Sequence, residues 1–106
     1  MTDIWRSFVA QRIAWENDWH ILYHKPSVFQ ERNEHNLLKD FEQEVPGYLL
    51  NAKITSALDK LNLKQGQEFI SENLMICYKA MVEHGFIDKE ELALLDAWII
   101  DINNLI

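Results

Sequence analysis

The N-terminal segment carries three side chains that could bind a metal ion. Glu16, His20 and His24 follow one another at intervals of four residues, so a helix through them would place all three on neighbouring turns. Carboxylate and imidazole groups are ligands that zinc and iron accept. Metal sites in helical bundles usually draw ligands from several helices, and a solvated polar face explains the same residues. We therefore predict no metal ion or other cofactor and keep this trio as the alternative.

Cys77, the only cysteine of the chain, is a second candidate for chemistry. A nucleophilic thiol needs a neighbouring base and a lowered pKa, and the adjacent Ile76 and Tyr78 provide neither. A free cysteine on the apolar side of a helix is more typical of a core residue. The sequence also contains no nucleophile elbow and no glycine-rich phosphate loop. We therefore predict that the chain is not an enzyme.

The first element that would position these residues is a long amphipathic helix over 3–23. Its apolar residues, which include Trp5, Trp15 and Trp19, fall on one face at helical spacing. Pro26 disfavours helical geometry at the residue before it, which predicts that the helix stops near His24. We predict that the tryptophans pack in the core, with part of a ring left for a partner. Arg12, which interrupts their stripe, is expected to pair with a carboxylate or extend to solvent, and an interface role stays open.

Helical periodicity continues through the rest of the chain. Residues 27–33 are expected to form a loop or frayed helix, and the apolar pattern of 37–45 predicts a short helix that ends near Glu44, before Pro46 and Gly47. A third helix is predicted to end near Asn62 and a fourth at His84-Gly85. A fifth is predicted to begin at Asp88. No segment alternates like a strand. The sequence therefore predicts an all-α fold, a single compact bundle of four to five helices, forming one domain over 1–106.

The last predicted helix is apolar nearly all round. Besides its main stripe it carries Leu94, Trp98 and Ile100 at other angles, which leaves a narrow polar strip. A helix of this kind is either central in its bundle or covered by a partner. The sequence leaves both alternatives open. If a partner covers the helix, that partner could be a second copy of the chain, which would give a homodimer through the C-terminal helix.

Acidic residues dominate two parts of the chain, whose net charge is −7. Segment 31–44 has five acidic residues against Arg32 and Lys39, and from residue 86 onward five acidic residues face only Lys89. This charge disfavours nucleic acids and anionic membranes and favours a basic protein partner. The predicted partner-binding residues are these acids together with one aromatic: Glu31, Glu34, Asp40, Glu42, Glu44, Asp88, Glu90, Glu91, Asp96, Trp98 and Asp101.

In size, charge and helical class the chain resembles the small acidic immunity proteins of bacterial toxin systems. That resemblance implies a protein that neutralises a basic, nuclease-like toxin by covering its active or binding surface. A dimerising structural or regulatory module is the alternative, followed by a metal-binding helical protein. The N-terminus has no signal-peptide pattern, and no apolar run approaches the length of a membrane span, so the predicted location is the cytoplasm.

Overall fold

The computed structural model describes residues 2–31, 34 and 36–105, and it confirms the predicted all-α class. Four α-helices and one short 3-10 helix form the described part of the chain, which contains no strand. The elements in order are α1 (Thr2–Glu16), α2 (Leu37–Asp59), η1 (Gln67–Phe69), α3 (Ile70–Glu83) and α4 (Glu90–Leu105).

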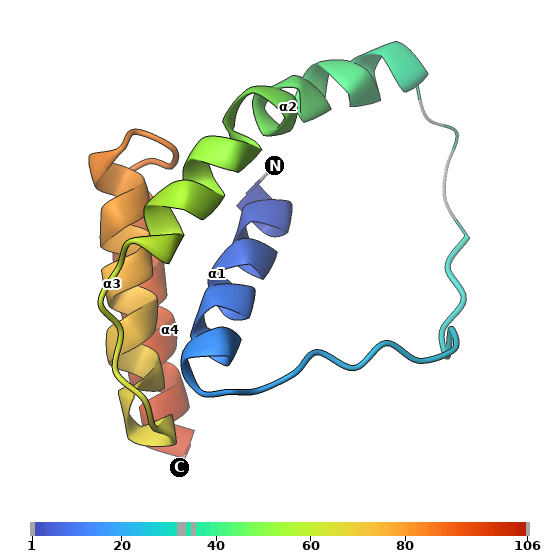
Figure 1. Ribbon diagram of the computed structural model, residues 1–106. Coiled ribbons are helices and arrows are strands. Elements are labelled where there is room, and N and C mark those ends of the chain that lie inside the picture. The colour runs from blue at the N-terminus through green and yellow to red at the C-terminus, as the bar shows by residue number, and fades with distance from the viewer. Residues whose placement is uncertain (1, 32–33, 35, 106) are drawn as a thin grey trace.

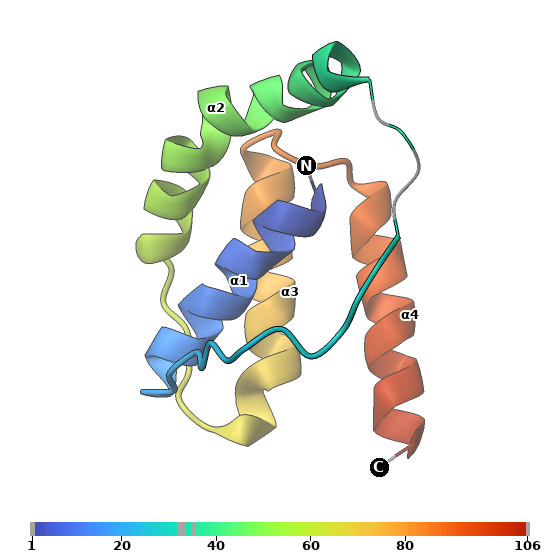
Figure 2. The same ribbon diagram turned by 90° about the vertical axis from the view of Figure 1, so that its right-hand side faces the viewer.

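Helix α3 is the centre of the packing. It contacts α1, α2 and α4, and the two views in Figures 1 and 2 show the other helices arranged around it. Its buried residues meet those of α1 and of the C-terminal half of α2, and this core includes Val9, Ile13, Ile54, Leu58, Cys77 and Met81. Helix α4 lies on the outside of α3, and Leu95 is the one buried residue among the described residues of that helix. The alternative in which the C-terminal helix occupies the centre of the bundle is therefore wrong.

Helix α1 ends at Glu16, well before the predicted end near His24. Asp18 adopts the left-handed conformation, with φ of 56°, and so takes the place that glycine usually holds past a helix end. The Trp19 N–H donates to the Ala14 carbonyl at 2.8 Å, and the Asp18 N–H donates to the Trp15 carbonyl at 3.1 Å. These two bonds form a Schellman motif, which redirects the chain before Pro26 has any influence.

Helix α2 runs through Pro46 and Gly47, so the prediction of two separate helices at this place is wrong. Asn36 begins it by accepting hydrogen bonds at its Oδ1 from the N–H groups of Leu38 and Lys39, at 3.1 and 3.3 Å. A proline removes one bond of the helical ladder, and its usual consequence is a bend rather than an end when the chain beyond it packs well. Ile54 and Leu58 provide that packing, and Figure 1 shows α2 as a bent helix.

The peripheral segment 19–45 contains no buried residue among those that the structure describes. Its described residues form an exposed extended stretch after Asp18 and the first half of α2, which projects beyond the body of the bundle (Figures 1 and 2). Leu37 and Leu38, which belong to the apolar pattern that predicted a helix here, are each 81% exposed. The apolar pattern correctly indicated that 37–44 is helical, but it predicted neither the length of the helix nor the surface against which it would pack.

The two remaining helices agree with their predicted positions. Helix α3 ends at His84-Gly85 as predicted, with Gly85 at a φ of 75° and the Phe86 N–H donating to the Met81 carbonyl at 2.9 Å. Helix α4 begins at Glu90, two positions after the predicted start at Asp88. These two helices and α1 position the residues of the candidate site.

Candidate functional site

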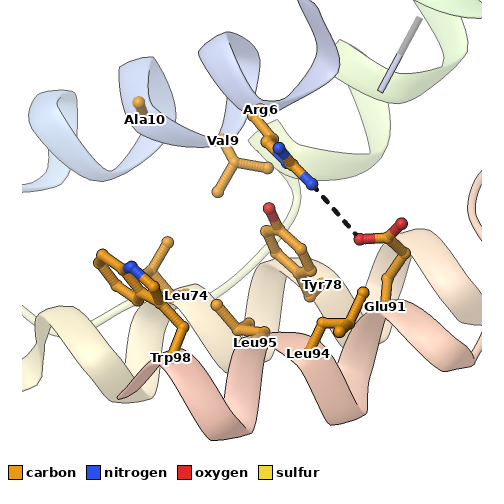
Figure 3. A pocket seen from close by; sticks show the side chains of 9 residues that line it. All are labelled: Arg6, Val9, Ala10, Leu74, Tyr78, Glu91, Leu94, Leu95 and Trp98. Atoms are coloured by element: carbon orange, nitrogen blue, oxygen red, sulfur yellow. Dashed lines mark ion pairs between the residues drawn. The ribbon is translucent and has the colours of Figure 1, made fainter. Parts of the chain in front are cut away.

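A pocket of about 380 Å³ opens between α1, α3 and α4. This volume lies in the range of small-molecule sites, about 300 to 1,000 Å³. Figure 3 shows α1 on one side of the pocket and α4 on the other, with side chains of α3 between them. Its lining consists of Arg6, Val9, Ala10, Leu74, Tyr78, Glu91, Leu94, Leu95 and Trp98.

Helical spacing explains why these residues meet in one place. Residues three, four and seven positions apart lie on the same face of a helix, and Glu91, Leu94, Leu95 and Trp98 follow this rule on α4. Arg6 and Ala10 are related in the same way on α1. The pocket is therefore where three such faces converge rather than the product of one sequence motif.

An ion pair closes one end of the pocket. Arg6 Nη2 lies 3.5 Å from Glu91 Oε2, which joins α1 to α4 (Figure 3). The Arg6 side chain is 57% exposed and that of Glu91 25%, and exposed pairs of this kind contribute about 0 to 1 kcal/mol to stability. The pair therefore contributes little to stability, and it places a cation and a carboxylate opposite one another at this end of the pocket.

Trp98 lies at the other end of the pocket and remains 54% exposed. Figure 3 shows its ring beside Leu74, away from Arg6 and Glu91. Tyr78 is mostly buried, and its hydroxyl points from α3 toward α1. The pocket thus combines an accessible aromatic face, an apolar middle and a polar end.

Polar contacts of Arg12 hold α1 against the end of α2. Its guanidinium donates to the carbonyls of Leu58 and Leu61, at 2.9 and 2.7 Å, and lies 3.6 Å from the Glu16 carboxylate. Carbonyl groups at the C-terminal end of a helix have no partner within that helix, so a cation there is favourable. The sequence-based expectation of a carboxylate partner for Arg12 is confirmed, and the carbonyl contacts explain its place inside an apolar stripe.

Two further contacts complete this support of α1. Trp5 is buried, and its indole Nε1–H donates to Asn51 Oδ1 on α2 at 2.9 Å. Asn17 donates to the Ile13 carbonyl at 3.0 Å and accepts from the Gly66 N–H at 2.7 Å. The predicted core role is thus confirmed for Trp5, whereas Trp15 and Trp19 are 59% and 39% exposed. Because α1 is fixed from α2 and from the loop at Gly66, the wall that it contributes to the pocket is well defined.

Most of the predicted partner-binding acids lie elsewhere. Glu91 and Trp98 line the pocket together, whereas Asp96 and Asp101 are exposed on α4 outside its lining. The other predicted acids are spread over the N-terminal end of α4 and its preceding turn, and over the peripheral segment: Asp88, Glu90, Glu31, Glu34, Asp40, Glu42 and Glu44. Sequence reasoning missed Arg6 and Tyr78 as site residues. The spacing of Arg6 and Ala10 was visible, but nothing in it indicated which helix would lie opposite.

The structure does not bring the metal trio together on one helix. Glu16 is the last residue of α1 and pairs with Arg12, whereas His20 and His24 lie in the exposed extended segment that follows. The helical premise of that alternative is therefore wrong. Within the described part of the chain, no group of three or more potential ligands is placed to hold a metal ion.

Cys77 is buried in the core, as predicted. Burial raises the pKa of its thiol to about 11, and the positive charge of Arg12 offsets only part of that increase. The thiol is therefore protonated near neutral pH and is separated from solvent. Both properties are typical of a core residue and neither suits a nucleophile.

A family model described as STELLO glycosyltransferases matches residues 1–106 of the chain. No curated protein and no solved structure matches the chain. The family match contradicts the predicted immunity or toxin-inhibitor function, and also the prediction that the chain is not an enzyme. Many unrelated proteins share this size, charge and helical class, so these properties indicated the wrong class of protein.

The predictions about binding partners, oligomeric state and cellular location are not tested by these findings. A basic partner, a homodimer through the C-terminal helix, the exclusion of nucleic acid and of membranes, and a cytoplasmic location all stay predictions. Among the described helices, none has both the length and the apolar character that a bilayer crossing requires.

Proposed function

The chain belongs to the STELLO glycosyltransferase family, and from this premise we propose that it takes part in the transfer of a sugar residue. In this proposal the pocket between α1, α3 and α4 holds part of the substrate. The observation that carries it is the convergence of charged, aromatic and apolar side chains from three helices on one concave site.

The reaction class defines what such a site must do. In glycosyl transfer, the oxygen of an acceptor hydroxyl bonds to the anomeric carbon of the donor, and the bond from that carbon to the leaving group breaks. The hydroxyl proton passes to a base. A carboxylate that accepts the hydrogen bond of this hydroxyl both orients it and offers a place for its proton. Glu91 supplies a carboxylate to the pocket, and its Oε2 lies 3.5 Å from Arg6 Nη2.

The test is a transfer assay with the whole chain. Labelled sugars are offered as nucleoside diphosphate donors together with disaccharide acceptors, and the labelled product is counted. We expect transfer that depends on both protein and acceptor, and that Glu91→Gln lowers about a hundredfold, as loss of a group that assists proton transfer does.

Glu90→Gln is the matched control for this assay. Glu90 has the same chemistry, precedes Glu91 on α4 and is exposed outside the pocket lining. Its loss should leave transfer unchanged. Absence of transfer with every donor, or equal activity of the two variants, would contradict the proposal.

A further inference from the structure

The two ends of the pocket differ in chemistry, and that difference identifies a class of ligand. One end presents the half-exposed ring of Trp98 and the other presents the Arg6–Glu91 pair, with Leu94 and Leu95 between them (Figure 3). A ligand that fills the pocket must therefore offer an apolar face to an indole and hydrogen-bonding groups to both a guanidinium and a carboxylate.

An uncharged sugar has this combination. The C–H groups on the face of a pyranose ring project outward from that face, and their hydrogens carry small positive charges. The face of an indole ring is negative, so the two faces attract one another. Sugar hydroxyls both donate and accept, so they can satisfy Glu91 and Arg6 together. Glu91 and Trp98 are seven residues apart on one face of α4, about 10 Å along the helix axis. This separation suits two linked sugar rings rather than one.

A phosphate group suits the pocket less well. Arg6 is the cation of the pocket lining, and its charge is offset by Glu91 at 3.5 Å. A diphosphate would bring negative charge toward that carboxylate in a chain whose net charge is already −7. The electrostatics of the pocket therefore favour the neutral sugars of an acceptor over the diphosphate of a donor.

We infer that the pocket between α1, α3 and α4 is a binding site for the acceptor carbohydrate, with one sugar ring stacked on Trp98 and the hydroxyls of the next held by Arg6 and Glu91. That the bound sugar is the acceptor of the transfer rests on the proposed function, but the binding of an uncharged disaccharide can be measured without any transfer. Trp98 acts as the stacking platform, and the ion pair sets the position of the second ring.

The experiment is a titration of the ¹⁵N-labelled chain followed by the indole N–H signals in two-dimensional NMR. The chain has four tryptophans, and Trp98→Phe assigns the signal of Trp98 by its disappearance. Gluco-, galacto- and manno-configured disaccharides are added separately, and uridine diphosphate is the anionic probe. We expect at least one disaccharide to shift the Trp98 signal saturably and the diphosphate to leave it in place.

The other tryptophans are controls within the same spectrum. Trp15 is 59% exposed, close to the 54% of Trp98, but it lies outside the pocket lining. Its signal should not move. In affinity measurements, Trp98→Leu should weaken disaccharide binding about tenfold, the scale of a lost aromatic contact, while Trp15→Leu should have no effect.

Two results would overturn the inference. One is that no disaccharide at millimolar concentration moves the Trp98 signal, and the other is that the diphosphate moves it at lower concentration than any disaccharide. Disaccharide binding without catalysed transfer would confirm a carbohydrate-binding site but count against the proposed function, and with it against the sugar being an acceptor. Transfer without a response of Trp98 would do the reverse.

Discussion

Two regions of the protein differ in how far their apolar residues are buried. One is the body, which consists of α1, the second half of α2, α3 and α4, and the other is the peripheral segment 19–45. In the body, Ile54 is 0% exposed and Val9 1%, because α1, α2 and α3 cover one another. In the peripheral segment, Tyr23 and Phe29 are each 87% exposed although their side chains are larger. Helical or apolar character alone therefore does not make a core; a second element must lie opposite.

This difference also locates the candidate site. The pocket lies where α4 meets the body, so its walls are set by the packed part of the chain. The exposed apolar side chains of the peripheral segment are of the kind that marks contact with other molecules, and they lie beside several of the predicted partner-binding acids. The two regions should consequently respond very differently to substitution.

Truncation of a core side chain should show the contrast most strongly. Ile54→Ala removes a fully buried side chain from α2 and leaves a cavity between helices that are closely packed. We expect the free energy of unfolding to fall by about 3 to 5 kcal/mol, measured by urea denaturation. Leu49→Ala, on the same helix but at a residue 68% exposed, is the control and should cost far less. Equal losses would mean that burial does not decide how much an apolar residue of α2 contributes to stability.

A buried polar contact should have the next effect. Asn73 is 0% exposed; its side chain accepts from the Lys64 N–H at 3.0 Å and donates to the Lys64 carbonyl at 2.8 Å. Asn73→Ala would leave both backbone groups without these partners, at a cost of about 2 to 4 kcal/mol. Asn104→Ala, at an exposed position of α4, should be neutral in the same denaturation assay. A neutral Asn73→Ala would show that water replaces both contacts.

The buried thiol predicts a pH dependence that belongs to the body alone. Above pH 9 the unfolded chain releases the Cys77 proton, whereas the folded chain retains it until its pKa of about 11. The folded state then binds more protons, so this contribution to stability is complete below pH 9 and declines as pH rises toward 11. The loss should approach about 2 to 3 kcal/mol.

Other groups also titrate in that range, so the measurement is a comparison. The difference in unfolding free energy between the wild type and Cys77→Ala should change between pH 9 and 11, with the wild type losing more. A constant difference would indicate that the thiol is reached by solvent in the folded state.

Substitutions in the peripheral segment should have the smallest effect on stability. Leu37→Ser and Leu38→Ser alter side chains that are 81% exposed, so we expect a change of less than about 0.5 kcal/mol for each in urea denaturation. Their helical cap at Asn36 is untouched. A loss of several kcal/mol would mean that this half of α2 is covered in solution, by the chain or by another molecule, and the comparison with the body would fail.

The local pattern of the sequence was sufficient to predict the helical class, the apolar faces of α3 and α4, the glycine end of α3 and the buried state of Cys77. These features depend on periodicity and on the conformations available to a few residues, which act over one or two helical turns. The two acidic segments are likewise a property of composition.

One feature depended on an unusual local conformation, and two depended on contacts between distant parts of the chain. Helix α1 ends at Glu16 because Asp18 adopts a left-handed conformation, which is uncommon for a residue other than glycine. Helix α2 continues through Pro46 because Ile54 and Leu58 pack beyond it. The pocket forms because α4 lies against α3 and brings Glu91 to Arg6, from opposite ends of the sequence. Periodicity records which face of a helix is apolar, but the partner of that face is chosen by packing in three dimensions, and the candidate site exists only after that choice.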